Sequence, residues 1–436
     1  RNSIRAPPWP NLQKFALLPH NAPRPNSCEF GYNWDMPYSL QARVVYPVDR
    51  PPVEHGVVTI DGERIVAVGT KAVGGEVIDL GNVALLPGLV NAHTHLEFSY
   101  LLQPLGQPGM RLVDWIRLVI AERGRTKRKP MEDMKRGLHQ ALEAGVTTVG
   151  DITTNIQTLG GDVTHFHEVI AFSRARAGSA MTGLVERIES QRANSNDSLH
   201  GVSPHAPYTV SPNLIELLVS YARQRNVSVA MHLAESRGEL ELLRDGTGPF
   251  RDLLEERSMW DAEAIPHGSR PLDYLRLLAQ APRALVIHGN YLVNDELAFI
   301  GAHRDRMSLI YCPRTHAYFA HPPYPLNDAL AAGVRIALGT DSRASNPDLS
   351  VLAEMRHATR MHPHVVPEQI LRMGTLDGAA ALGRESDVGS ITAGKRANLV
   401  AVPIRDDEHA RPTQILEAIL ADDAAPWSVY LSGRRL

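Results

Sequence analysis

The sequence predicts an α/β fold: a (β/α)8 TIM barrel with a small composite β-sandwich built from the N- and C-terminal segments. Two observations support the barrel. Short apolar runs alternate with helix-like stretches, and polar residues of ligand type directly follow these runs. Strands that alternate with helices indicate parallel βαβ units, and a barrel of such units assembles its site where the strands end. The 436 residues suffice for a barrel with one added module.

The two ends of the chain supply the predicted sandwich. Residues 38–82 contain short strand-like runs, and the Asp61-Gly62 pair between two of them is typical of a hairpin turn. Residues 386–436 contain two further strand-like runs. Because neither end has enough strands to be stable alone, we expect them to pair. Residues 1–37 are rich in proline and are expected to form an extended arm on the surface or on a neighbouring subunit.

Residues 83–385 are assigned to the barrel, where apolar runs mark the strands. The first run ends at His95, and the others are Val146–Val149, Met181–Val185, Leu199–Ser203, Val227–Met231, Ala284–Ile287, Ser308–Tyr311 and Val334–Leu338. Helix-like stretches between these runs include Met131–Glu143, Pro212–Arg225 and Pro271–Ala279. In the first of them, apolar residues recur at helical spacing and Gly145 suits a left-handed cap.

Polar residues follow several of the predicted strands. His93 and His95 end the first strand one residue apart, and side chains at this spacing project to the same face of an extended strand. Two neutral imidazoles on one face can bind a divalent metal. Four later strands are followed in the same way by His205, His232, His288 and Asp341. We therefore expect one site at the end of the barrel.

Taken in order, these motifs resemble the amidohydrolase superfamily. The motifs are His93-Thr94-His95, Pro204-His205-Ala206-Pro207-Tyr208-Thr209, His232-Leu233-Ala234-Glu235, His288-Gly289 and Gly339-Thr340-Asp341. The resemblance is to the metal-dependent branch that holds S-adenosylhomocysteine, guanine, aminofutalosine and cytosine deaminases and the triazine hydrolases. It runs from about Leu40 to the C-terminus and implies the same composite β-sandwich around the barrel.

The predicted metal ligands are His93, His95, His232 and Asp341. Three nitrogens and one oxygen suit Zn²⁺, which we expect first, with Fe²⁺ or Mn²⁺ as alternatives. One coordination position then remains for a water molecule, whose pKa a metal can lower to about 7.

The expected metal count is one divalent transition metal per chain. Binuclear members of the superfamily bridge two metals through a carboxylated lysine or a glutamate from a mid-barrel strand. Between Lys135 and Lys395 the chain has no lysine, which excludes a lysine bridge. Glu186, near the end of the predicted third strand, is the one candidate considered for a glutamate bridge.

Three residues are predicted to be catalytic: Glu235, His288 and Asp341. The resemblance implies that Glu235 carries a proton to the ring nitrogen beside the attacked carbon, although a solvated glutamate opening the next helix is the alternative. A carboxyl group with a raised pKa can serve as both acid and base. Asp341 can accept a proton from the attacking water, and His288 can donate to the developing oxyanion.

Substrate contacts are predicted for six residues around this site. His205 corresponds by motif to a substrate-contacting histidine in similar deaminases, and Trp115 is interpreted either as a stacking lid or as a core residue. The six residues are Glu97, Trp115, His205, Arg314, His316 and Arg343. The Arg314-Thr315-His316 loop departs from the asparagine-rich pattern of the family, which is compatible with an acidic or hydroxyl-rich substituent such as the tail of aminofutalosine.

Composition argues against nucleic-acid binding, membrane association and cysteine-based sites. A formal net charge of −3 offers no basic footprint for nucleic acid and no polybasic patch for a membrane surface. No apolar run approaches the roughly 18 residues that span a bilayer. Two cysteines, Cys28 and Cys312, exclude a disulfide framework and a cysteine-rich zinc site and favour the cytoplasm. The expected partner is a small-molecule substrate, and a homo-oligomer is compatible with the sequence.

The predicted activity is hydrolytic deamination of an amino-substituted N-heterocycle, purine-like or a nucleoside such as aminofutalosine, with release of ammonia. One alternative keeps the same ligands but opens a cyclic amide or dechlorinates a triazine-type substrate. A second alternative is a non-catalytic barrel that keeps a metal for stability and binds a ligand.

Overall fold

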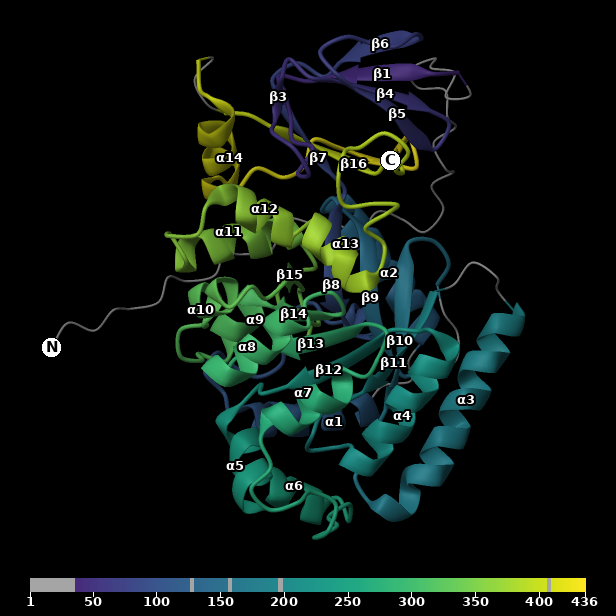
Figure 1. Ribbon diagram of the computed structural model, residues 1–436, viewed down its shortest axis with the longest axis vertical. Helices are drawn as coiled ribbons and strands as arrows, with labels where there is room; N and C mark the ends of the chain where they lie inside the picture. Colours follow the sequence, from purple (N-terminus) through teal and green to yellow (C-terminus); the bar gives the residue numbers. More distant parts are fainter. Residues whose placement is uncertain (1–35, 126–128, 156–158, 195–198, 406–408) are drawn as a thin grey trace, which may run out of the picture.

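The computed structural model describes residues 36–125, 129–155, 159–194, 199–405 and 409–436 (Figure 1). Nearly all of the proline-rich arm predicted at residues 1–37, together with Cys28, lies outside these residues. In Figure 1 a β-sandwich occupies the top of the molecule and the barrel lies below it. Among the described residues, no helix is long and apolar enough to cross a membrane.

Eight parallel strands form the barrel, each paired with the next along the chain. They are β8 (Leu89–Thr94), β9 (Val146–Thr153), β10 (Val163–Val169), β11 (Leu199–Pro204), β12 (Val229–Leu233), β13 (Ala284–His288), β14 (Met307–Tyr311) and β15 (Ile336–Leu338). The barrel closes where the backbone amides of Thr340 and Asp341 both donate to the carbonyl of His93, each at 3.1 Å. The predicted fold class is confirmed.

Helices cover the outside of the barrel and its mouth. They are α1 (Leu112–Arg125), α2 (Pro130–Glu143), α3 (Ala177–Asn194), α4 (Pro212–Arg225), α5 (Arg237–Asp245), α6 (Pro249–Glu256), α7 (Pro271–Leu278), α8 (Asn294–Ala302), α9 (Pro313–Tyr318), α10 (Leu326–Ala331), α11 (Val351–Met361), α12 (Pro367–Met373), α13 (Leu376–Leu382) and α14 (Pro412–Ala421), with short 3₁₀ turns at Leu96–Phe98 and Arg174–Arg176. The helix predicted at Pro212–Arg225 is α4, which ends at Asn226 in the left-handed conformation.

The prediction of the third barrel strand was wrong. Met181–Val185 lies within α3, and the third strand is β10, with Glu168 near its end. The strand was missed because its outward side chains are polar: His165 contacts Asp151 at 3.1 Å and His167 contacts His200 at 3.0 Å. Partners on neighbouring strands thus provide hydrogen bonds for these buried polar groups.

Glu186, the residue considered for a metal bridge, consequently lies on α3 and is exposed.

Strands from both ends of the chain build the sandwich, which confirms that prediction. One sheet has the order β5-β4-β1-β6 and the other β18-β17-β16-β7-β2-β3. Their bounds are β1 (Tyr38–Gln41), β2 (Val44–Val45), β3 (Val53–Glu54), β4 (Val57–Asp61), β5 (Arg64–Gly69), β6 (Glu76–Asp79), β7 (Val83–Pro87), β16 (Leu399–Pro403), β17 (Ser428–Leu431) and β18 (Arg434–Arg435). The β4–β5 hairpin turns after Asp61 as predicted, and β7 joins the two ends by pairing antiparallel with β16.

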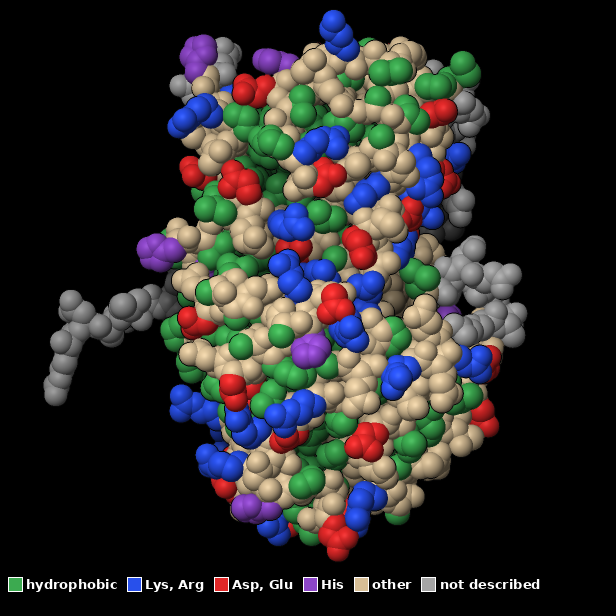
Figure 2. Space-filling view, in the orientation of Figure 1, with side chains coloured by type: hydrophobic (Ala, Val, Ile, Leu, Met, Phe, Trp, Pro, Cys, Tyr) green, Lys and Arg blue, Asp and Glu red, His purple; other side chains and the backbone are tan. Residues whose placement is uncertain are grey.

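Three apolar clusters matter for the position of the site. Small and branched side chains such as Val90 and Ala92 fill the barrel interior together with the ring of Phe166. A larger cluster packs the strands against the surrounding helices. A third lies at the mouth, where α1, α6 and α9 contribute side chains and where Tyr208 follows β11. Helices α1, α5 and α6 lie at the end of the molecule away from the sandwich (Figure 1). On the face drawn in Figure 2, basic and acidic side chains are interspersed.

Candidate metal and catalytic site

Histidines and an aspartate meet where β8, β12, β13 and β15 end. Asp341 Oδ1 lies 3.4 Å from His93 Nε2 and 3.7 Å from His95 Nε2. The ring of His93 is centred 5.0 Å from the rings of His95 and His232 and 5.7 Å from that of His288. All five side chains are buried. The structure therefore brings the four sequence-predicted ligands together, with His288 beside them.

The donor set fits a divalent transition metal. Among the described residues, both ring nitrogens of His93 and Nδ1 of His95 are buried without a hydrogen-bond partner, an arrangement that ligation would relieve. His232 Nδ1 contacts the carbonyl of His205 at 2.9 Å, which leaves Nε2 free to bind a metal. Burial lowers the pKa of both His95 and His232, so their imidazoles are neutral, as ligation requires.

The carboxylate of Asp341 is held in its charged form. Burial by itself would raise the pKa of Asp341, but the contacts with His93 and His95 hold it below its ordinary value. Ser345 Oγ donates to Asp341 Oδ2 at 2.6 Å and fixes the orientation of the group. Oδ1 is consequently the oxygen directed at the histidines.

Three non-glycine residues at strand ends have left-handed backbone conformations. Their φ values are 53° at Ala234, 68° at His288 and 55° at Asp341. Such conformations cost about 1–3 kcal/mol each and persist where the surroundings impose them. Here Tyr324 donates to the carbonyl of His288 at 2.9 Å, and Thr94 donates to that of Asp341 at 2.7 Å. The backbone that carries the site is therefore strained and fixed.

Glu235 follows β12 and is positioned to hold a proton beside the histidines. Its Oε1 lies 3.4 Å from His288 Nε2, and Tyr208 donates to its Oε2 at 3.5 Å. Burial, and then the carboxylates of Asp341 and Glu239, raise the pKa of Glu235 well above its ordinary value. Glu239 also accepts the backbone amides of Ala234 and Glu235 at 2.7 and 2.8 Å, which holds the turn in place.

Two of the predicted substrate contacts lie on the β8–β11 side of the mouth. Glu97 is buried and accepts hydrogen bonds from Arg123 and, at 3.1 Å, from Thr154. His205 is partly buried, contacts Thr209 through Nδ1 at 2.7 Å, and has its ring centred 5.0 Å from that of His232. His205 thus borders the histidine–aspartate cluster, whereas the carboxylate of Glu97 is held by Arg123 and Thr154.

Trp115 lies on α1, the helix that follows β8, and Arg343 lies in the loop after β15. Trp115 Nε1 donates to the carbonyl of Ala344 at 3.1 Å, and its ring packs edge-on against Phe319 at 5.4 Å. Arg343 donates to the carbonyl of Leu102 at 3.0 Å. These contacts connect the segment after β8 with the loop after β15 across the mouth.

Arg314 and His316 lie on α9, and their side chains are engaged within the protein. Arg314 binds Glu354 at 2.7 Å and Asp348 at 2.6 Å through its guanidinium. His316 is buried, with its ring centred 5.4 Å from that of His321 and 5.9 Å from that of Tyr311. The structure does not bring either residue into the histidine–aspartate cluster.

Several site residues escaped sequence reasoning, notably Glu168, Tyr324 and Ser345. Glu168 was missed with its strand, because only Phe166 and Val169 are apolar between Thr164 and Val169, so the run shows no alternation of polar and apolar residues. Tyr324 and Ser345 act through single hydrogen bonds, and no spacing in the sequence marks them.

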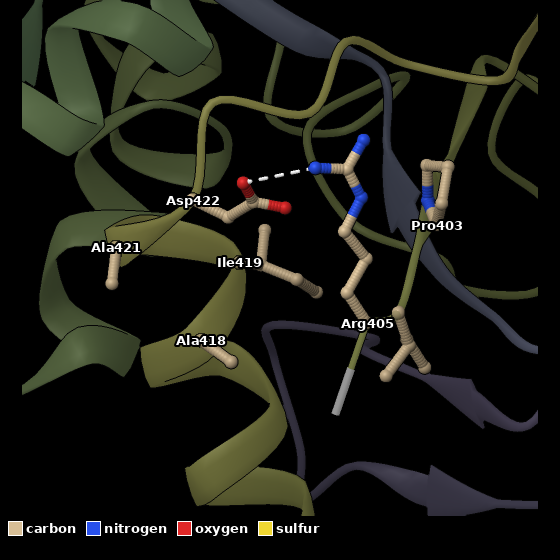
Figure 3. Close-up of a pocket in the computed structure, with 7 residues that line it drawn as sticks. Pro403, Arg405, Ala418, Ile419, Ala421 and Asp422 are labelled. Atoms are coloured by element: carbon tan, nitrogen blue, oxygen red, sulfur yellow. Dashed lines mark hydrogen bonds and ion pairs between the residues drawn. The ribbon is translucent and has the colours of Figure 1, made fainter. Parts of the chain in front are cut away.

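A hollow beside α14 lies away from this site, at the sandwich end of the molecule (Figure 3). Its volume is about 380 Å³, and the Arg405–Asp422 ion pair spans it at 3.3 Å. The rest of its lining is Pro403, Ile404, Ala418, Ile419 and Ala421. The lining contains no histidine, and the chemistry is assigned to the barrel mouth.

The amidohydrolase family matches residues 84–434. The chain belongs to this family. It is therefore a metal-dependent hydrolase of carbon–nitrogen bonds, and the resemblance found in the sequence is confirmed. Its relatives include the 5-methylthioadenosine/S-adenosylhomocysteine deaminase of Moorella thermoacetica, which is 30% identical over 409 residues, 86% of this chain and 87% of the relative.

Solved structures share the fold. The Helicobacter pylori aminofutalosine deaminase complex with methylthio-coformycin has a TM-score of 0.79 at 22% identity, covering 92% of this chain and 100% of that one. An adenosine deaminase from Xanthomonas campestris with bound zinc has a TM-score of 0.69 at 22% identity, covering 91% and 92%.

Proposed function

We propose that this chain hydrolytically deaminates an amino-substituted purine-like nucleoside and releases ammonia. The observation that carries the proposal is a protonatable, buried Glu235 between Tyr208 and His288, beside a complete set of metal ligands. Relatives that share about 30% identity over most of the chain are deaminases of 5-methylthioadenosine and S-adenosylhomocysteine.

The site takes one divalent transition metal, with zinc expected first. His93, His95, His232 and Asp341 would hold it. When bound, the metal would lower the pKa of a water molecule toward about 7 and so supply the nucleophile at neutral pH. A single metal is supported by the absence of lysine between residues 135 and 395. Glu168, which ends the true third strand, belongs to none of the ligand clusters among the described residues.

The protein's own groups move the protons. Asp341 accepts a proton from the attacking water. Glu235 donates a proton to the ring nitrogen beside the carbon that carries the amine, and His288 donates a hydrogen bond to the developing oxyanion. Asp341 passes its proton to the amine, which leaves as ammonia, and the hydroxyl proton returns to Glu235 as the ring carbon becomes a carbonyl. Glu97 and His205 contact the bound heterocycle from the opposite side of the mouth.

Arg314 is assigned to loop support. Its ion pairs with Asp348 and Glu354 hold the segment after β15, and Asn346 links the same Glu354 to the carbonyl of Thr340 beside Asp341. Because Arg314 is already paired with these two carboxylates, we do not propose that it binds an acidic tail of the substrate. Aminofutalosine stays a candidate substrate, next to 5-methylthioadenosine and S-adenosylhomocysteine.

An ammonia-release screen tests the proposal. Zinc-loaded protein is offered these three nucleosides together with adenosine, guanine, cytosine and triazines, and Glu235→Gln protein serves as the matched control. We expect ammonia from at least one purine nucleoside with the wild type and strongly reduced release with the variant. If a cyclic amide is opened or a triazine is dechlorinated, and no aminated purine releases ammonia, the deaminase proposal is wrong. Ligand binding without any turnover would indicate the non-catalytic barrel.

A further inference from the structure

Carboxylates and a histidine lie at the ends of β8, β10 and β11, in the half of the barrel mouth that does not carry Glu235 and Asp341. Glu97 follows β8, Glu168 ends β10, and His205 follows β11. Phe166 points into the barrel interior, and side chains two residues apart on a strand share a face. Glu168 therefore points toward the same interior, one layer above Phe166 and at the open end of the strand.

Glu168 lacks the partners that other buried carboxylates in this chain have. Glu97 accepts from Arg123 and Thr154, whereas Glu239 accepts two backbone amides. The side chain of Glu168 is 3% exposed, and His205 Nε2 lies 4.0 Å from it, beyond hydrogen-bonding distance; burial lowers the pKa of His205 to about 3, so this imidazole is neutral. Arg187 donates to its backbone carbonyl. Within the described residues, no hydrogen bond to the Glu168 carboxylate is found.

A buried carboxylate without a donor is unfavourable, and a bound molecule that supplies a donor removes the penalty. The position of Glu168 determines which part of a substrate it would meet. The ring of His205 is centred 5.0 Å from that of His232, a proposed metal ligand, and Glu168 Oε1 lies 4.0 Å from His205 Nε2. A nucleoside whose reacting carbon lies at the histidine–aspartate cluster can therefore place a group outside its reacting centre against His205 and Glu168.

We propose that Glu168, with His205 beside it, is a specificity subsite for a neutral hydrogen-bond donor that lies outside the reacting centre of the substrate. The inference rests on the proposed function. The Glu168 carboxylate lies without a donor, so as a hydrogen-bond acceptor it suits a hydroxyl or an amino group and not an anionic group. Two sources share this chemistry: a hydroxyl of the nucleoside sugar, or a second amino group on the ring edge.

Binding of purine ribosides that lack the leaving amine tests the subsite without any turnover. Dissociation constants for purine riboside, its 2′-deoxy and 3′-deoxy analogues and 2-aminopurine riboside are measured by calorimetry on zinc-loaded wild-type, Glu168→Ala and Glu168→Gln protein. Glu186→Ala, an exposed glutamate on α3, is the matched control. Parallel kcat/KM measurements use adenosine, the two deoxyadenosines and 2,6-diaminopurine riboside.

If a sugar hydroxyl is the donor, the wild type favours the riboside over one deoxy analogue by about tenfold to a hundredfold, as expected for a hydrogen bond to a charged group. If a ring amino group is the donor, the 2-amino compound is favoured by a similar factor. The preference disappears in Glu168→Ala, is weakened in Glu168→Gln and persists in Glu186→Ala. Equal ratios in the wild type and both Glu168 variants, in binding and in turnover, would overturn the subsite. Binding preferences without ammonia release would contradict the proposed function alone.

Discussion

The two sides of the barrel mouth are built in different ways. The β12, β13 and β15 ends carry Ala234, His288 and Asp341 in left-handed conformations, each fixed by buried hydrogen bonds. At the described ends of β8 to β11, no non-glycine residue has a positive φ. There the groups are held by side-chain contacts such as that between Glu97 and Arg123. The difference teaches that, apart from His93 and His95 on β8, the reacting groups are carried by a strained backbone, whereas the groups proposed for recognition are held by side-chain contacts.

Removing a metal ligand should have the largest effect. In His232→Ala the metal content is expected to fall from about one equivalent per chain, because a catalytic site depends on three or four protein ligands. Activity falls with it. Elemental analysis of the purified variant checks this. Two equivalents in fully active wild-type protein would contradict the single-metal proposal, and an unchanged content in the variant would remove His232 from the ligand set.

Loss of the proton carrier should leave the metal in place. Glu235→Gln keeps the size of the side chain but cannot titrate, so turnover is expected to fall on the order of 10²-fold or more while metal content persists. Steady-state kinetics and elemental analysis on one preparation separate the two effects. A joint loss of metal and activity would make Glu235 a structural support of the site.

A smaller effect is expected from the hydroxyl that holds His288. Tyr324→Phe removes the hydrogen bond to the His288 carbonyl and keeps the ring that stacks on Tyr311 at 3.8 Å. Loss of one such bond should reduce kcat by about threefold to tenfold with little change in KM. Tyr311→Phe, which loses a contact to His362 instead, is the matched control. Equal kcat in the two variants would argue against a positioning role for Tyr324.

The smallest effect concerns stability against pH. Burial raises the pKa of Glu239 from 4.5 to about 7. Between these values the folded state keeps a proton that the unfolded state has lost. The contribution of Glu239 to the unfolding free energy is therefore complete below about pH 4.5 and is lost as pH rises toward 7, with a slope of at most about 1.4 kcal/mol per pH unit.

Urea unfolding of wild-type and Glu239→Gln protein across this range checks the direction. The difference in unfolding free energy between the two proteins should shift in favour of the variant as pH rises from 4.5 to 7, and then stay constant. A difference that does not change with pH would show that folding does not raise the pKa of Glu239.

Sequence analysis predicted best those features that leave a pattern in neighbouring residues. The His93–His95 spacing and the polar residues after the apolar runs were sufficient to predict the barrel and the residues that meet at its mouth. Strand β10 escaped because its histidines are buried against partners on other strands, which no local pattern records. The engagement of Arg314 by Glu354, forty residues away, is likewise a property of the folded chain.

Simultaneous quantification of ammonia and of the deaminated nucleoside tests the central claim most directly. Zinc-loaded protein is incubated with adenosine, 5-methylthioadenosine, S-adenosylhomocysteine and aminofutalosine, and both products are followed over time. The account predicts equimolar ammonia and oxo-product from at least one of them, lost on metal removal and restored by adding zinc back. Metal-replete, folded protein that releases no ammonia from any aminated purine nucleoside would contradict it.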